Sequence, residues 1–234
     1  MKNLLSRGGI EIIAVFIGIS GGLWSEKQIE LKNTLKSEKV ALKSIREQFI
    51  SDSTALTFVI ESVENEQKSF ENLLEHIKRD TTLTEKSLNS TIKDIIFFSY
   101  FTEDKSAYES LIEAAGKKII QSDSLARNIS SVYSTSYKNL EDVFKVQSDI
   151  LALKTYESFV DAGGYLDSKN FSITESLNQD QKKMFNKVFS DNKFITQLVF
   201  HYDTNFFVIR RYELAVKKLR YVINEIDNYL ESEA

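Results

Sequence analysis

The feature that most constrains the fold is an apolar residue at every seventh position along a stretch near the start of the chain. A repeat of seven keeps one stripe of a slightly underwound helix facing a neighbouring helix. The stretch is therefore expected to form one long helix that buries a seam in an elongated bundle or coiled coil. The repeat consists of Leu35, Leu42, Phe49, Leu56, Val63, Phe70 and Ile77.

Proline, the residue that most disrupts helix interiors, is absent from all 234 residues. Long uninterrupted helices are the expected result, and we predict an all-α protein in which residues 25–234 form a helical bundle. Its first helix is expected over about residues 26–79 and its last over about residues 192–230. The glycines outside the N-terminal segment, Gly116, Gly163 and Gly164, are expected at turns.

The second seam position of the first helix alternates between apolar and acidic residues. In a parallel homodimer such acids would face their own copies and repel each other. We therefore expect this helix to pack against other helices of the same chain; the alternative is that the acids turn outward. The apolar members are Ile45, Val59 and Leu73, and the acidic members are Glu38, Asp52 and Glu66.

The first 24 residues have the properties of a membrane anchor. Residues 8–24 are almost entirely apolar, and two preceding leucines extend the run to the roughly 20 residues that a transmembrane helix needs. Lys2 and Arg7 can reach one interface while Trp24 marks the other. We predict a single-pass anchor in the inner membrane, with the bulk of the chain in the periplasm. A cleaved signal peptide and an interfacial or buried helix are the alternatives.

The anchor also contains candidate contacts with lipid and with a second helix, at Glu11, Gly18, Gly22 and Trp24. Gly18 and Gly22 have the spacing that lets two membrane helices approach closely. Glu11 lies four residues after Arg7, so it can pair with Arg7 near the headgroups or contact an oligomer partner. Proton or ion handling by Glu11 is the alternative reading.

Further helices are expected after the first. One covers about residues 106–115 and ends at Gly116, and a long one starts at Ser122 or Asp123, either of which can cap its first turn. The stretch from Gly163 to about residue 179 lacks periodicity and is expected to be a loop. The apolar positions of the long helix are Leu125, Ile129, Val132, Tyr133, Leu140, Val143, Ile150 and Leu153.

Three more apolar segments are expected to contribute to the core. A shorter helical segment is expected to end in the run from Ile95 to Phe101, which is too short to cross a bilayer. A partner-binding patch is the alternative for this run. A short helix bearing Met184 and Val188 precedes the last helix. That last helix carries a second heptad pattern, so the two heptad helices are expected to share one core. Its members are Tyr202, Ile209, Val216, Ile223 and Leu230, joined by Leu198, Tyr212, Leu219 and Ile226.

The sequence contains no motif that indicates catalysis or cofactor binding. There is no cysteine, no phosphate-binding glycine loop and no serine motif that places a base beside a hydroxyl. His76 and His201, the only two histidines, are expected to be solvent-facing or hydrogen bonded to neighbours rather than ligands or bases. We therefore predict no catalytic residue, no metal and no cofactor. With 30 basic and 34 acidic residues, nucleic acid binding is also not expected.

The last helix is locally basic. Glu213 is the only acid among five cations, which are Arg210, Arg211, Lys217, Lys218 and Arg220. The main interpretation is a solvated face or pairing with acidic neighbours. A surface for a partner protein or for anionic lipid is the alternative.

Two groups of residues carry a resemblance to a known family: Glu11, Gly18, Trp24 and Glu26 around the apolar run, then Tyr108, Leu111, Gly116, Ile119, Leu125, Ile129 and Tyr133. They resemble an uncharacterised family of small, membrane-anchored helical proteins of Gram-negative bacteria. This chain departs from the family pattern because Ile10 separates Gly9 from Glu11, the anchor is shorter, and Ser25 replaces an asparagine. The resemblance implies a topology and adds no catalytic residue.

The sequence thus favours a membrane-anchored helical scaffold or protein-interaction module without catalytic activity. Its expected partners are membrane lipid, through the N-terminal helix, and a protein or a second copy of the chain. The partner is expected to contact an exposed helix face or the loop after Gly163. The alternative function is a periplasmic bundle that senses a small ligand between its helices. A membrane-bound hydrolase is a more distant possibility, because no nucleophile and base are recognisable.

Overall fold

The computed structural model describes the backbone of residues 2–79, 98–114, 119–165 and 179–232, and in these ranges side chains other than those of residues 2–25, 79 and 114. This described part of the chain is helical and contains no strand, which confirms the all-α prediction. The elements are α1 Lys2–Arg79, α3 Ser106–Ala114, α4 Asp123–Ser131, η1 Val132–Tyr137, α5 Lys138–Lys145, η2 Val146–Ala152, α6 Leu153–Asp161, α7 Gln179–Val188 and α8 Asn192–Ser232.

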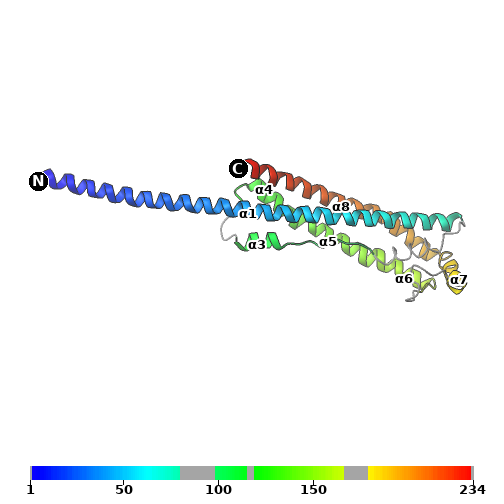
Figure 1. Ribbon diagram of the computed structural model, residues 1–234. Coiled ribbons are helices and arrows are strands. Elements are labelled where there is room, and N and C mark those ends of the chain that lie inside the picture. Colours follow the sequence, from blue (N-terminus) through cyan, green and yellow to red (C-terminus); the bar gives the residue numbers. More distant parts are fainter. Residues whose placement is uncertain (1, 80–97, 115–118, 166–178, 233–234) are drawn as a thin grey trace.

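Three long helical rods form the bundle, as Figure 1 shows. The first is α1, the second runs without a break from α4 to α6, and the third is α8. The first two run in the same direction and α8 runs antiparallel to both, so that its C-terminal end lies beside α4. The short helix α3 packs beside α1, and α7 lies at the opposite end of the bundle. The prediction of a helical bundle is confirmed.

The N-terminal part of α1 projects beyond the bundle (Figure 1). Residues 26–33 are all exposed, and the first buried side chain along α1 is that of Glu38, counting from residue 26. The predicted anchor, residues 1–24, lies outside the residues whose side chains are described, and so do Glu11, Gly18, Gly22 and Trp24. Along the part of the chain with described side chains, no helix combines the length and apolarity that crossing a membrane requires.

The heptad seam of α1 is buried as predicted. Leu35 and Ile77, at its two ends, are half-buried, and the five positions between them have no exposed surface. The buried seam residues belong to two clusters of core residues. One cluster includes Phe49 and the other includes Phe70. The sequence pattern therefore identified the face of α1 that holds the bundle together.

The predicted stripe of α8 lies at the edge of its buried face rather than at the centre. Tyr202, Ile209, Ile223 and Leu230 are half-buried. The centre consists of two heptad columns, one of them including Leu198, Tyr212, Leu219 and Ile226 as expected. The sequence pattern did not reveal both columns, because His201 and Asn205 each place a polar residue in an otherwise largely apolar column. The full columns are Phe194, His201, Val208, Ala215 and Val222, and Leu198, Asn205, Tyr212, Leu219 and Ile226.

The rod from α4 to α6 contains two π-helical segments, η1 and η2. Each widens the helical turn, so the residues that follow move around the axis relative to an uninterrupted α-helix. Ile150 and Leu153, predicted to face the core, are exposed, while Leu151 and Thr155 are buried in their place. The prediction for these two positions was wrong because it assumed one constant period along the helix.

The turn residues follow the sequence signals. Ser122 is the N-cap of α4, and its hydroxyl accepts a hydrogen bond from the Leu125 N–H at 3.3 Å. Gly163, just after α6, has φ = 99°, which favours glycine. At Gly164 a β-carbon would lie 2.5 Å from the Phe159 ring, so only glycine fits there. Gly116 lies outside the described residues.

The outcome is mixed for the other predicted core segments. Phe101 is buried whereas Tyr100 is exposed, and residues 98–105 are not helical; residues 95–97 lie outside the described ranges. Met184 and Val188 on α7 are buried as predicted. Most of the predicted loop after Gly163, residues 166–178, also lies outside the described ranges.

Candidate functional site

The three acidic residues of the α1 seam are buried inside the bundle. Glu38, Asp52 and Glu66 each meet a polar group from another element, so the expectation of packing within one chain is confirmed and the outward alternative is wrong. They follow each other at intervals of two heptads and therefore form polar layers along one line of α1. Aspartate and glutamate are rarely buried in protein cores, so these layers are the first candidates for a functional site among the described core residues.

The first layer joins α1 to both other rods. The Glu38 carboxylate accepts hydrogen bonds from the Gln121 backbone N–H at 2.7 Å and from the Tyr229 hydroxyl at 2.9 Å, both at Oε1. Gln121 immediately precedes the cap of α4, and Tyr229 is in the last turns of α8. The layer thus fixes the register of three helices at one end of the bundle.

The second layer joins α1 to the π-helical segment η1. The fully buried Tyr137 donates its hydroxyl hydrogen to Oδ2 of Asp52. Burial raises the pKa of Asp52 from 3.8 to about 6, although the Tyr137 hydrogen bond acts in the opposite direction. Burial also raises the pKa of Tyr137 well above its usual value, and the hydrogen bond to Asp52 adds to this effect.

The raised pKa of Asp52 predicts a specific pH dependence of stability. A carboxyl whose folded pKa exceeds its unfolded pKa stabilises the fold most below the unfolded value, and that stabilisation is lost as pH rises through the folded value. The D52N variant should therefore gain free energy of unfolding relative to the parent chain as pH rises from 3.8 to about 6. Urea unfolding followed by circular dichroism over this range measures the difference.

Tyr137→Phe provides the matched control for this pH effect. It removes the hydrogen bond that lowers the pKa of Asp52, so the stability loss should extend to higher pH than in the parent chain. An unfolding free energy that has the same pH profile in the parent and in D52N would contradict the assignment to Asp52.

The third layer brings a hydroxyl, an imidazole and a carboxylate into one line. Thr155 Oγ1 lies 3.0 Å from Nδ1 of His201, and Nε2 of His201 lies 3.1 Å from Oε1 of Glu66. This order is the one used in nucleophilic catalysis. All three side chains, however, are buried, and the Thr155 hydroxyl has no access to solvent. The arrangement therefore suits a structural polar layer better than an active site.

The remaining polar contacts in the described core have the same character. The Tyr212 hydroxyl donates to Oε1 of Gln147 at 2.7 Å, which links α8 to η2, and burial raises the pKa of Tyr212 to about 12.

His76 is half-buried, with its ring 6.2 Å from that of Phe189. His201 is buried and lies within hydrogen-bond distance of Thr155, which confirms for this residue the prediction of a histidine bonded to its neighbours.

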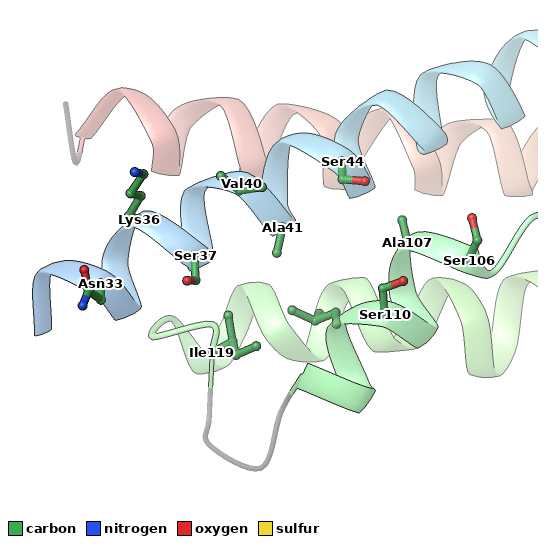
Figure 2. Close-up of a pocket in the computed structure, with 11 residues that line it drawn as sticks. Asn33, Lys36, Ser37, Val40, Ala41, Ser44, Ser106, Ala107, Ser110 and Ile119 are labelled. Atoms are coloured by element: carbon green, nitrogen blue, oxygen red, sulfur yellow. The ribbon is translucent and has the colours of Figure 1, made fainter. Parts of the chain in front are cut away.

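A groove of about 710 Å³ lies between α1 and α3. Figure 2 shows Ser37 and Ala41 of α1 facing Ala107 and Ser110 of α3 across it. Among the described lining residues most side chains are small and weakly polar, and Lys36 is the one that carries a charge. The described lining therefore offers shape and apolar surface, and its serine hydroxyls and Lys36 are not accompanied by a carboxylate or a histidine.

The five predicted cations of the partner surface lie on α8. Four are exposed and Lys218 is half-buried. Arg210 pairs with Glu213 at 3.3 Å, and the Arg211 guanidinium lies 4.7 Å from the centre of the Phe207 ring. Lys218 Nζ donates to Oδ1 of Asn128 on α4 at 3.2 Å. The five cations thus share one helix, and some of them are held in place by neighbouring side chains; Arg220 lies on a different heptad column from the other four.

The sequence interpretation missed the apolar residues that accompany these cations. Phe200, Phe207, Leu214 and Tyr221 are exposed on α8, one heptad apart. The seven-residue repeat of these four residues is present in the sequence. The buried stripe of α8 repeats at the same interval, and the heptad pattern was assigned to that stripe alone. The exposed fractions were needed to separate the two faces.

Among the residues that the structure describes, no three histidine, aspartate or glutamate side chains lie close enough together to hold a metal ion. No family model, curated protein or solved structure matches this chain.

Proposed function

We propose that the protein is a single-pass, membrane-anchored helical scaffold without catalytic activity. The observation that carries this proposal is the continuity of α1, whose backbone is helical from Lys2 to Arg79. The apolar N-terminal segment passes into the bundle without a turn or linker. Residues 25–37 then act as a stalk of about 20 Å at 1.5 Å per residue.

The proposed location is the inner membrane, with the bundle in the periplasm. Lys2 and Arg7 favour retention of the N-terminus in the cytoplasm. The resemblance to membrane-anchored helical proteins of Gram-negative bacteria supports the same topology. Lipid contacts are assigned to the first helix, including Trp24, and self-association to Gly18 and Gly22.

The proposed mechanism is positioning of a partner protein. The buried polar layers fix helix register, and the aligned hydroxyl, imidazole and carboxylate of Thr155, His201 and Glu66 are buried. On α8, cations lie beside exposed large apolar side chains. A protein partner or a second copy of the chain is therefore assigned to this face, and neither a cofactor nor nucleic acid is part of the proposal.

Membrane insertion is tested by fractionating cells that express the full chain. We expect it in the membrane pellet after alkaline carbonate extraction, and we expect its mass to include residues 1–24. In the matched control, I13K/I17K, each lysine adds about 2.5–3.5 kcal/mol to the cost of insertion at a helix centre, so the control should leave the pellet. A parent chain that is extracted by carbonate, or that has lost its first residues, would contradict the anchor.

The groove between α1 and α3 favours a second candidate function, the sensing of a small ligand. A volume of about 710 Å³ is large enough for a metabolite. The test is thermal unfolding of the full chain in detergent with a panel of metabolites. A large upward shift in Tm with one compound would favour the sensor over the scaffold.

A further inference from the structure

The exposed side of α8 carries a second heptad seam that no described residue covers. We define the α8 seam as Phe200, Phe207, Leu214 and Tyr221, which are 48, 47, 45 and 52% exposed. Four large apolar side chains at a strict interval of seven form a straight stripe on a helix in a left-handed bundle. The α8 helix therefore presents one seam to the core and another to solvent.

Cations border the α8 seam on both sides in its central part. Arg210 and Lys217 lie three residues after Phe207 and Leu214, and Arg211 and Lys218 lie four residues after them. Residues at these spacings are neighbours on a helix surface. Arg220 belongs to a different column, together with Phe206 and Glu213, and does not border the seam.

Several side chains along the α8 seam are held in position by direct contacts. Arg211 lies over the Phe207 ring at 4.7 Å, and Lys218 lies 5.3 Å from the centre of the Tyr221 ring. The Tyr221 hydroxyl donates to Oε1 of Glu225 at 2.8 Å, while Oε2 of Glu225 accepts from Asn128 at 2.8 Å. A surface ordered in this way loses less side-chain entropy when a partner binds.

We propose that the α8 seam docks an amphipathic helix of a partner protein that has an apolar seam bordered by aspartate and glutamate. The inference deepens the scaffold function proposed above and rests on it, because it names the partner chemistry of the scaffold. Apolar residues at heptad spacing supply the burial, and charges beside the seam select the partner. Cations on both sides of the seam select acids.

A second copy of the chain is a poor occupant of this face. In a symmetric antiparallel pair centred between Phe207 and Leu214, Arg210 and Arg211 would approach their own copies. In a parallel pair the column of Arg210 and Lys217 would face the column of Arg211 and Lys218 on the other copy. Like charges across a helical seam are destabilising, so self-pairing through this face is disfavoured.

Anionic lipid is also a poor occupant if the anchor spans the membrane as proposed. Arg46 pairs with Asp227, and Glu66 lies 3.1 Å from His201, so the cations of α8 are level with the part of α1 between residues 46 and 66. Residue 46 lies about 33 Å along the helix from Trp24, at 1.5 Å per residue. An upright α1 keeps the cations several Debye lengths of about 8 Å from the headgroups.

The test uses the full chain in non-ionic detergent and two fluorescent synthetic helices of four heptads. Both helices have leucine at the seam positions, and the bordering positions are glutamate in one and lysine in the other. We expect the glutamate helix to bind at least tenfold more tightly than the lysine helix, as measured by fluorescence anisotropy. The R211E/K217E variant should abolish this preference, because it leaves one acid and one cation on each side of the seam.

Two further variants test whether the peptide binds to the seam or to any exposed apolar side chain. F207S/L214S should weaken binding of the glutamate helix at least tenfold. F58S, the matched control, removes a 67% exposed phenylalanine on α1 and should leave binding unchanged.

Three results would overturn the proposal. They are equal affinity for the two helices, a dimer that F207S/L214S dissociates in sedimentation experiments, and binding to phosphatidylglycerol vesicles but to neither helix. Membrane fractionation is read independently of the peptide assay. If carbonate extracts the chain but the chain still binds the glutamate helix selectively, the docking surface is upheld and the anchor is refuted. If the chain stays in the membrane pellet but binds neither helix selectively, the anchor is upheld and the docking surface is refuted.

Discussion

Replacement of Phe49 by alanine is expected to lower the free energy of unfolding by about 3–5 kcal/mol, the usual cost of removing a buried phenylalanine. Phe49 has no exposed surface, and its ring centre lies 5.5 Å from that of Tyr133 in η1. The cavity would therefore open in the middle of the α1 seam, where α1 packs against the second rod. Urea unfolding of the full chain in detergent, followed by circular dichroism, measures the loss.

Phe58→Ala is the matched control for this prediction, because it makes the same change on the same helix. Phe58 is 67% exposed, so the change in unfolding free energy should stay within about 0.5 kcal/mol. Similar losses in F49A and F58A would mean that α1 does not bury the face assigned to it.

The second large effect is expected at the polar layer of Glu66 and His201. His201→Leu removes a neighbour of the buried Glu66 carboxylate and should cost about 3–5 kcal/mol, as for other broken buried pairs. The double variant E66L/H201L removes both polar groups and should be more stable than H201L alone. The same unfolding measurement on the two single variants and the double variant gives the coupling energy.

A different outcome would assign these residues another role. If the losses in E66L and H201L simply add in the double variant, the two side chains are not energetically coupled. The layer would then not explain why an acid occupies the seam at position 66.

The sequence was sufficient to predict the seam of α1 and the ends of the long helices, because period and helix caps are local properties. The seven positions from Leu35 to Ile77 needed no knowledge of the partner helix. Burial of Glu38, Asp52 and Glu66 could be inferred only in part. The repulsion argument favoured packing within one chain, but the neighbouring side chains of Tyr137, His201 and Tyr229 are distant in sequence and could not be paired with these acids in advance.

Two other features escaped prediction for different physical reasons. The π-helical segments shift the buried face after residue 145 by a change in helical period, and the sequence pattern alone gave no sign of that change. Ile150 and Leu153 were therefore assigned to the core although they are exposed. At the candidate docking surface the cations were recognised, but the apolar seam beside them was not, since α8 repeats at the same interval on both of its faces.

The unbroken course of α1 has a mechanical consequence. A helix of 78 residues extends about 117 Å at 1.5 Å per residue, and no hinge interrupts it. It behaves as a lever: a change in tilt of about 10° at its base sweeps its far end through about 20 Å. Rotation of the base about the helix axis would likewise turn the α8 seam to a new azimuth. In the proposed membrane-anchored arrangement, the bilayer or a neighbouring membrane helix would thereby steer where that face points without any rearrangement inside the bundle.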